Sequence, residues 1–207
     1  MSNTEMKNGL IIDGKGNKEW YKNDVLHRED GPARETQNGR KEWWLNGKRH
    51  RDNDLPAIEY SSGTKEWYIT GKLHRENDLP AIEHSNGDKR WYQDGVLHRV
   101  DKPAIEYASG HKEWYQHGLL HREDGPAIEF ADGDKEWWLN GKRHRDNDLP
   151  AIDSIEGKVW FQNGEIHREN GPAAEDSNGD KFWYKHGKLH RDNGLPAIEF
   201  ENGDKNW

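Results

Sequence analysis

A tryptophan that recurs at an almost constant interval limits the fold of this chain more than any other feature. Successive units begin 23 or 24 residues apart, at Trp20, Trp43, Trp67, Trp91, Trp114, Trp137, Trp160 and Trp183, with Trp207 opening a ninth. A fixed period of this length is the signature of a repeat protein, in which each unit packs on its neighbours. The sequence therefore predicts one elongated domain over residues 10–207, made of eight tandem repeats with half-repeats at both ends, after a lead-in over residues 1–9.

The composition is compatible with an ordered chain only because of these aromatic residues. Hydrophobic residues make up 30% of the sequence and the net charge is -8, a balance typical of disorder, but 11 Trp at fixed positions indicate a repeated packing role. Charges of both signs are spread evenly, so duplex nucleic acid is not an expected partner. Neither a signal peptide nor a membrane-length apolar run is present, which predicts a cytoplasmic protein without a membrane role.

Turn residues occur twice in each repeat and separate short segments rich in aromatic and β-branched residues. Asn46-Gly47 and Ser62-Gly63 are examples, and they bracket segments such as KEWYI and PAIEY. Such a pattern indicates β-hairpins, and no segment has the apolar spacing of a helix. We therefore predict an all-β fold, a single-layer twisted antiparallel meander of tandem hairpins. Each repeat has two strands, and a third short strand through Leu73-His74-Arg75 is left open.

Each repeat carries two adjacent aromatic residues and one His-Arg pair. Successive strand residues point to opposite faces, so one ring lies on each side, and a single layer leaves about half of the rings partly exposed. The first ring is predicted to be structural, at Trp43, Trp67, Trp91, Trp114, Trp137, Trp160 and Trp183. The second ring and the arginine are candidates for partner binding, at Tyr68, Tyr92, Tyr115, Trp138, Arg75, Arg99, Arg122 and Arg145.

The arginines also have candidate partners inside the chain. Every repeat places an acid two residues after its Pro-Ala pair, so that one acid is present for each arginine. This match favours a ladder of cross-strand ion pairs, with Glu83, Glu106 and Glu129 as structural acids. The alternative is an arginine row that grips phosphates or carboxylates of a ligand. The recurring histidines are predicted to brace the loops through hydrogen bonds.

The repeat motif resembles a known family. The run NGKRH at Asn46–His50, a Gly-rich corner and a second strand that ends in an aromatic residue and a turn make the chain similar to a divergent MORN repeat array, from about Asn8 to Trp207. The resemblance implies a single-layer sheet that serves as a scaffold, a dimerisation element or a lipid-binding surface. The chain departs from the family where His-Arg-x-x-x-Pro-Ala replaces H-G-x-G, so the small residues that line the MORN groove are missing. This variant is similar to arrays in bacteriophage and giant-virus proteins, which implies a viral protein directed at a host defence or toxin protein in the host cytoplasm.

Metal binding and catalysis are not expected. Equivalent histidines would stand about 10 Å apart by strand spacing, too far to share a zinc ion, and the closer pairs His117/His121 and His186/His190 occur in only two repeats. Every candidate acid, base and cation recurs along an open ribbon, whereas an enzyme needs one asymmetric constellation in a pocket. No cofactor is predicted.

The sequence thus favours a non-enzymatic scaffold that presents an aromatic and charged β surface to a protein partner or to another copy of itself. The alternative is a binder of phosphorylated small ligands or lipid headgroups through the arginine row. Because the array begins at Leu10–Asp13 and stops at Trp207, both in mid-repeat, we also expect open sheet edges that favour a homo-oligomer.

Overall fold

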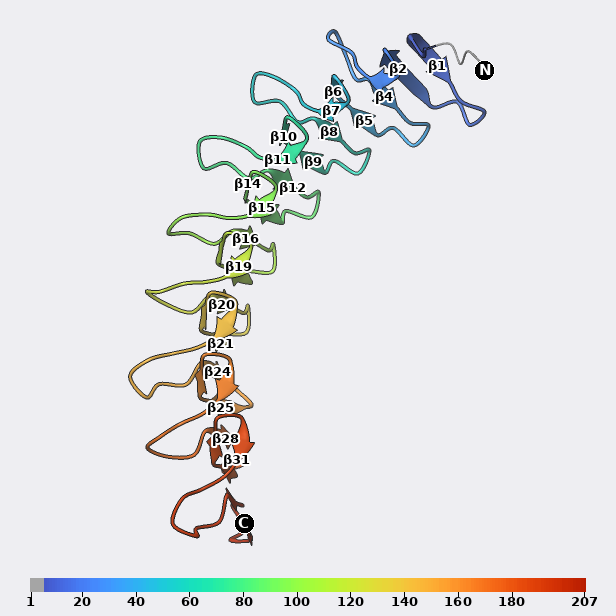
Figure 1. The fold of residues 1–207 in the computed structure, drawn as a ribbon. Coiled ribbons are helices and arrows are strands. Elements are labelled where there is room, and N and C mark those ends of the chain that lie inside the picture. The colour runs from blue at the N-terminus through green and yellow to red at the C-terminus, as the bar shows by residue number, and fades with distance from the viewer. Residues whose placement is uncertain (1–5) are drawn as a thin grey trace, which may run out of the picture. The chain divides into compact units, whose positions relative to one another are not determined.

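The computed structural model describes residues 6–207, and this part of the chain contains 33 strands and no helix. Contacts divide the chain into two units, Met1–Arg99 with Ala104–Ala108 and Val100–Pro103 with Ser109–Trp207. Within each unit the strands follow one another in a row, and the loops that carry the His-Arg pairs project from one side of it (Figure 1). The predicted all-β meander of tandem hairpins is therefore confirmed.

The strands are short, and most contain two residues. Those of the first unit are β1 (Gly9–Ile12), β2 (Lys18–Lys22), β3 (Val25–Leu26), β4 (Arg34–Glu35), β5 (Lys41–Glu42), β6 (Trp44–Leu45), β7 (Lys48–Arg49), β8 (Ile58–Glu59), β9 (Lys65–Glu66), β10 (Tyr68–Ile69), β11 (Lys72–Leu73), β12 (Ile82–Glu83), β13 (Lys89–Arg90), β14 (Tyr92–Gln93), β15 (Val96–Leu97) and β16 (Ile105–Glu106). Of the predicted lead-in, residues 1–5 lie outside the described residues and Gly9 already belongs to β1.

The second unit repeats the same order of elements. Its strands are β17 (Lys112–Glu113), β18 (Tyr115–Gln116), β19 (Leu119–Leu120), β20 (Ile128–Glu129), β21 (Lys135–Glu136), β22 (Trp138–Leu139), β23 (Lys142–Arg143), β24 (Ile152–Ser154), β25 (Gly157–Val159), β26 (Phe161–Gln162), β27 (Glu165–Ile166), β28 (Ala174–Asp176), β29 (Lys181–Phe182), β30 (Tyr184–Lys185), β31 (Lys188–Leu189), β32 (Ile198–Glu199) and β33 (Lys205–Asn206).

The third repeat shows how one unit of sequence is built. β9 runs up to Trp67, β10 continues beyond it and returns as β11, and a loop then leads into β12. β10 pairs with β11, whereas β9 pairs with β12 of its own repeat and with β8 of the repeat before. The open third strand is thus present, but it ends at Leu73 and does not reach Arg75.

The tryptophan strand, expected as one continuous strand, is broken at the tryptophan itself. The Trp67 N–H donates to the carbonyl of Ala81 at 2.8 Å, and the Trp67 carbonyl accepts from the His74 N–H at 3.1 Å. The chain changes its pairing partner at this residue. Trp20 makes the equivalent hydrogen bonds, but there β1 pairs with β2 on both sides of the tryptophan. Only the first repeat keeps a continuous strand among the described repeats, as β2.

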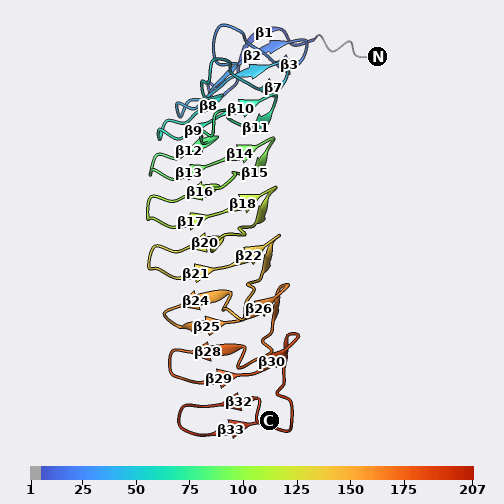
Figure 2. The same ribbon diagram turned by 90° about the vertical axis from the view of Figure 1, so that its left-hand side faces the viewer.

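Two kinds of turn hold the strands in register. Thr70 and Gly71 both have positive φ angles, 49° and 88°, as the two-residue turn of a tight hairpin requires, and the Gly71 N–H donates to the Arg49 carbonyl of the previous repeat at 2.9 Å. These small hairpins therefore bond to one another, and in the second unit β22, β26 and β30 lie beside the main strands (Figure 2). The longer turn after β8 is closed by a hydrogen bond from Tyr60 N–H to the Thr64 carbonyl.

The core is a thin strip of small and aromatic side chains. The alanine of each Pro-Ala pair is buried in all eight repeats, at Ala33, Ala57, Ala81, Ala104, Ala127, Ala151, Ala173 and Ala197. A larger side chain would not fit at a site this closely packed. Because each repeat buries little on its own, the fold depends on contacts between successive repeats.

Candidate functional site

An arginine guanidinium lies over a tryptophan ring in every repeat. The guanidinium carbon of the His-Arg pair stands between 3.5 Å and 4.2 Å from the centre of the first tryptophan ring of the same repeat. A guanidinium at this distance gains a favourable cation–π interaction, worth roughly 0.5–2 kcal/mol. The seven tryptophans predicted as structural are all members of such stacks.

The Nη1 atom of each stacked arginine points back into its own repeat. Arg75 Nη1 donates to the Pro80 carbonyl at 3.4 Å and to Glu83 at 3.0 Å. Ion pairs of the predicted kind are present at Arg51–Glu59, Arg75–Glu83, Arg99–Glu106, Arg122–Glu129, Arg168–Glu175 and Arg191–Glu199. The arginine thus fastens its loop to the second strand of the repeat.

Two repeats differ from this pattern. Arg28 pairs with Asp30 of its own loop at 2.8 Å. Arg145 donates to the Pro150 carbonyl at 3.0 Å, but the acid on its strand is Asp153, which is one methylene shorter than glutamate. Burial lowers the pKa of the Arg145 guanidinium, and the charge of Asp153 opposes this effect. Arg145 is therefore the least compensated of the four arginines predicted for partner binding.

The loop between His-Arg and Pro occurs in two lengths, and the longer one reaches the next repeat. Asp54 of the long second loop accepts two hydrogen bonds from Arg75, at 2.8 Å from Nε and 2.9 Å from Nη2. The backbone carbonyl of Asp54 accepts the indole N–H of Trp67 at 3.0 Å. The hydrogen bond from Arg75 lowers the pKa of Asp54, and burial opposes this effect.

Asp78 and Asp148 repeat this arrangement on the stacks that follow them. Asp78 binds Arg99 through both carboxylate oxygens and accepts the indole of Trp91 on its carbonyl. Asp148 does the same for Arg168 and Trp160. We call this arrangement the aspartate cap. The sequence analysis did not predict the aspartate cap, although the extra residue of the long loops is evident in the sequence.

The three capped tryptophans are among the most deeply buried. Trp67, Trp91 and Trp160, which are capped, are only 6–7% exposed. Trp43 and Trp137, which follow short loops, are half-buried. Trp114 is buried although its indole nitrogen has no hydrogen-bond partner, so loop length is not the only factor.

In the described part of the chain, three cavities lie where a short loop precedes a long one, and another, of about 370 Å³, lies at Trp138 and Phe161 of two small hairpins. One of these three cavities, of about 460 Å³, is lined by Trp43, Arg51 and the loops of the first two repeats. Cavities of about 440 Å³ and 230 Å³ occupy the same position beside Trp137 and Trp183. A site defined by loop length therefore occurs three times among the described residues.

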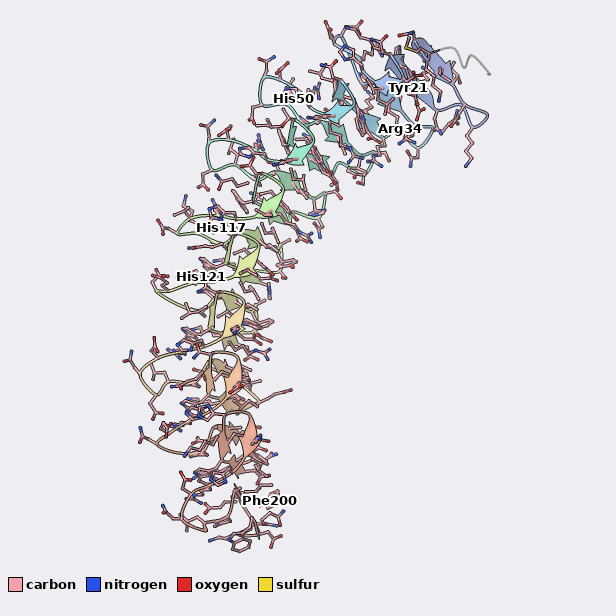
Figure 3. The ribbon with its side chains drawn as sticks, in the orientation of Figure 1. Tyr21, Arg34, His50, His117, His121 and Phe200 are labelled. Atoms are coloured by element: carbon pink, nitrogen blue, oxygen red, sulfur yellow. The ribbon has the colours of Figure 1, made fainter. Side chains whose placement is uncertain are left out.

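The recurring histidines join neighbouring repeats. His27 Nδ1 accepts the backbone N–H of Asn46 at 3.0 Å, and its Nε2 faces Glu29 at 3.2 Å. The same Nδ1 contact recurs at His50, His74, His121, His144 and His167. Figure 3 labels one such histidine in each unit, His50 and His121, at the base of the projecting loops. The loop-bracing role expected from the sequence thus extends to the turn of the following repeat.

The second aromatic ring has different neighbours from the first. Tyr68 donates its hydroxyl to Glu66 at 2.9 Å, and Arg49 lies 5.4 Å from the Tyr68 ring and 4.9 Å from the Trp44 ring. Burial, together with the hydrogen bond to Glu66, raises the pKa of Tyr68. These rings are half-buried in every repeat, at Tyr21, Trp44, Tyr68, Tyr92, Tyr115, Trp138, Phe161 and Tyr184.

The predicted partner-binding residues therefore fall into two sets. Arg75, Arg99, Arg122 and Arg145 belong to the tryptophan stacks, while Tyr68, Tyr92, Tyr115 and Trp138 belong to the second row of rings. A buried acid that the sequence did not predict contacts Trp44 of that second row. Glu42 is fully buried among three arginines, and Trp44 donates its indole N–H to it at 3.2 Å.

Within residues 6–207 no group of three or more His, Asp or Glu side chains is arranged to hold a metal ion. The same residues contain no helix with the length and hydrophobicity needed to cross a membrane. Neither the protein-family models nor the curated proteins compared with the chain give a match, so the likeness to MORN repeats stays a prediction from the motif.

Proposed function

We infer that this chain is a non-enzymatic scaffold that binds a protein through the second row of aromatic rings. The observation that carries this proposal is that the second ring is half-buried, and so keeps part of its surface in water, in all eight repeats. Tyr and Trp that keep part of their surface in water are the residues that most often anchor protein interfaces. A row of them offers a partner many equivalent contacts.

The rings are also held in place before any partner arrives. The Tyr68 and Tyr115 hydroxyls donate to strand glutamates at 2.9 Å, and the Trp138 indole donates to Glu136 at 2.8 Å. Binding to side chains that are already ordered costs less conformational entropy than binding to free ones. The surface therefore favours a specific partner.

The alternative, a binder of phosphorylated ligands or lipid headgroups through the arginine row, has less support. Six of the eight stacked arginines pair with a strand acid, and Arg75, Arg99 and Arg168 bind a cap as well. Catalysis has less support still, because the candidate groups recur from repeat to repeat and form no unique constellation. The resemblance to viral arrays supports a host defence or toxin protein in the cytoplasm as the partner, with a second copy of the chain as the other choice.

The proposal is tested by removing rings and keeping the fold. The full chain and a Tyr68→Ser, Tyr92→Ser, Tyr115→Ser variant would be compared in affinity purification from host cytoplasm and in sedimentation. The control is Ile155→Ser, which removes an apolar side chain that is 85% exposed on a turn. We expect one partner, or self-association, with wild type and control and its loss with the ring variant. Association unaffected by the ring variant, or absent in wild type, would contradict the proposal.

A further inference from the structure

The aspartate cap shows which ligand the arginine–tryptophan stack accepts. Asp54 supplies a carboxylate to the Nε and Nη2 atoms of Arg75 and a carbonyl oxygen to the Trp67 indole. Asn53 and Asp54 have positive φ angles of 62° and 53°, so the residue is presented by a tight left-handed turn. The ligand is thus an aspartate in a turn, and it is bound through three hydrogen bonds.

Four stacks follow a short loop and lack this ligand, those of Trp43, Trp114, Trp137 and Trp183. At Trp114 the Nε atom of Arg122 instead donates to Asp124 of its own loop at 2.8 Å, which leaves three stacks without a carboxylate at Nε. Short loops fold back on their own repeat: a Cβ on Gly31 would lie 2.9 Å from the guanidinium carbon of Arg28. In the stacks that follow, the hydrogen bonds and ion pairs of Arg51, Arg145 and Arg191 use Nη1. Within the described residues the other edge of each guanidinium, Nε and Nη2, therefore has no carboxylate.

The cavities of about 460 Å³, 440 Å³ and 230 Å³ lie at these three stacks. In the first, the acids of the walls already have partners, because Asp30 pairs with Arg28 at 2.8 Å and Asp52 faces His50 at 3.0 Å. Arg51 is the cation in this cavity whose Nε and Nη2 atoms can bind a ligand, and the half-buried Trp43 also lines the cavity. The volume of about 460 Å³ is large enough for a short turn of peptide.

We propose that the cavities beside Trp43, Trp137 and Trp183 bind an aspartate from a turn of a protein partner. The carboxylate accepts from Nε and Nη2 of Arg51, Arg145 or Arg191, and the aspartate carbonyl accepts from the indole, in the geometry that Asp54 shows within the chain. A single negative charge suits a site with one free cation and acidic walls better than a phosphate does. The proposed hydrogen bonds come from the arginine and the first tryptophan. Of the second row of rings only Tyr184 lines one of these three cavities, and the Tyr68, Tyr92 and Tyr115 variant leaves that ring in place.

The probe is a cyclic peptide that carries the chain's own turn, Asp-Asn-Asp-Leu-Pro, titrated into the isotopically labelled full chain. The indole N–H resonances report each tryptophan separately. We expect shifts at Trp43, Trp137 and Trp183, none at the capped Trp67, and none with a peptide in which Asn replaces the second Asp. Inorganic phosphate is titrated in parallel and should shift these resonances far more weakly.

Two kinds of variant sharpen the test. Arg51→Lys, Arg145→Lys and Arg191→Lys together keep the charge but remove the two-pronged contact, and should weaken peptide binding at least tenfold, whereas Arg90→Lys, outside the cavities, should not. Replacing Glu29–Gly31 by Asp-Asn-Asp-Leu gives the first loop a cap of its own. This exchange should abolish the Trp43 shift alone.

Each opposite result would overturn the proposal. These results are the absence of shifts with the aspartate peptide, equal shifts at Trp67, equal binding of phosphate, or binding that survives both the lysine variant and the loop exchange. The probe is a peptide and not the partner of the second row of rings. A failure of the peptide test therefore does not contradict the scaffold proposal, and a failure of the ring variant does not contradict the aspartate site.

Discussion

The same stretch of sequence occurs once in each unit, and the two copies differ only in what surrounds them. Lys41–Ile58 and Lys135–Ile152 are identical. Both place their arginine on the tryptophan ring, at 3.7 Å and 3.5 Å, and both line a cavity, of about 460 Å³ and 440 Å³. The local sequence thus determines the shape of a repeat.

The two copies differ in the ion pairs that their glutamate makes. Glu42 is fully buried, with arginine nitrogens of Arg34, Arg40 and Arg49 at 3.7 Å, 3.2 Å and 3.3 Å. The side chain of its counterpart Glu136 is 14% exposed and pairs with Arg143 alone. The residues flanking the repeated segment account for this difference, because the second copy has Ile128 and Asp134 where the first has Arg34 and Arg40.

The largest expected effect therefore belongs to Glu42. Glu42→Gln removes the charge that three arginines share, and should cost about 2–3 kcal/mol of local stability, since the arginines are partly hydrated and a buried pair can cost more. Glu136→Gln should cost less than about 1 kcal/mol. Hydrogen exchange of the β5 and β21 amides measures each region separately. Equal losses in the two variants would show that the flanking arginines do not stabilise Glu42.

The sequence predicts contacts within one repeat, but not the contacts that a repeat makes with its neighbours. The hairpins and the Arg75–Glu83 type of pair lie within one repeat, so both partners recur together and the period exposes them. The cap joins Asp54 of one repeat to Arg75 of the next, and it is present only where the loop is long. A pattern averaged over repeats hides such contacts.

The break in the tryptophan strand of the later repeats could not be predicted from the sequence, for a related reason. The run KEWYI has the composition of one strand, and only the hydrogen bonds from Trp67 to Ala81 and from His74 to Trp67 show that the pairing changes there. Likewise, the burial of Glu42 requires Arg34 of the preceding strand, which no property of its own segment indicates. Contacts between repeats therefore decide both features.

A smaller effect is expected at the acid that directly follows each copy. Arg51 pairs with Glu59 at 2.8 Å, whereas Arg145 has the shorter Asp153. Asp153→Glu should restore the pair and stabilise the second unit by about 0.5–1 kcal/mol, as expected for a partly exposed ion pair. The matched Glu59→Asp should lose a similar amount in the first unit. Denaturant unfolding followed by hydrogen exchange measures both, and a gain at both positions would show that side-chain length is not the cause.

The smallest expected effect is the weakening of the aspartate cap at low pH. Arg75 lowers the pKa of Asp54 below its ordinary value of about 3.9. The stability that the cap contributes is therefore present above the unfolded-state value and is lost as the pH falls through the lowered folded-state value. Its size is well below about 1 kcal/mol, because the Asp54 side chain is 48% exposed.

Indole N–H exchange at Trp67 should therefore accelerate on acidification in wild type more than in Asp54→Asn. The other carboxylates and the histidines titrate in both proteins, so the difference between the two isolates Asp54. Trp43 serves as the internal reference, because its stack has no cap and its exchange should show no such difference. If acid changes Trp67 equally in wild type and variant, then the cap carboxylate does not hold the loop on the next repeat, and the hydrogen bond to the Asp54 carbonyl alone is sufficient to bury the ring.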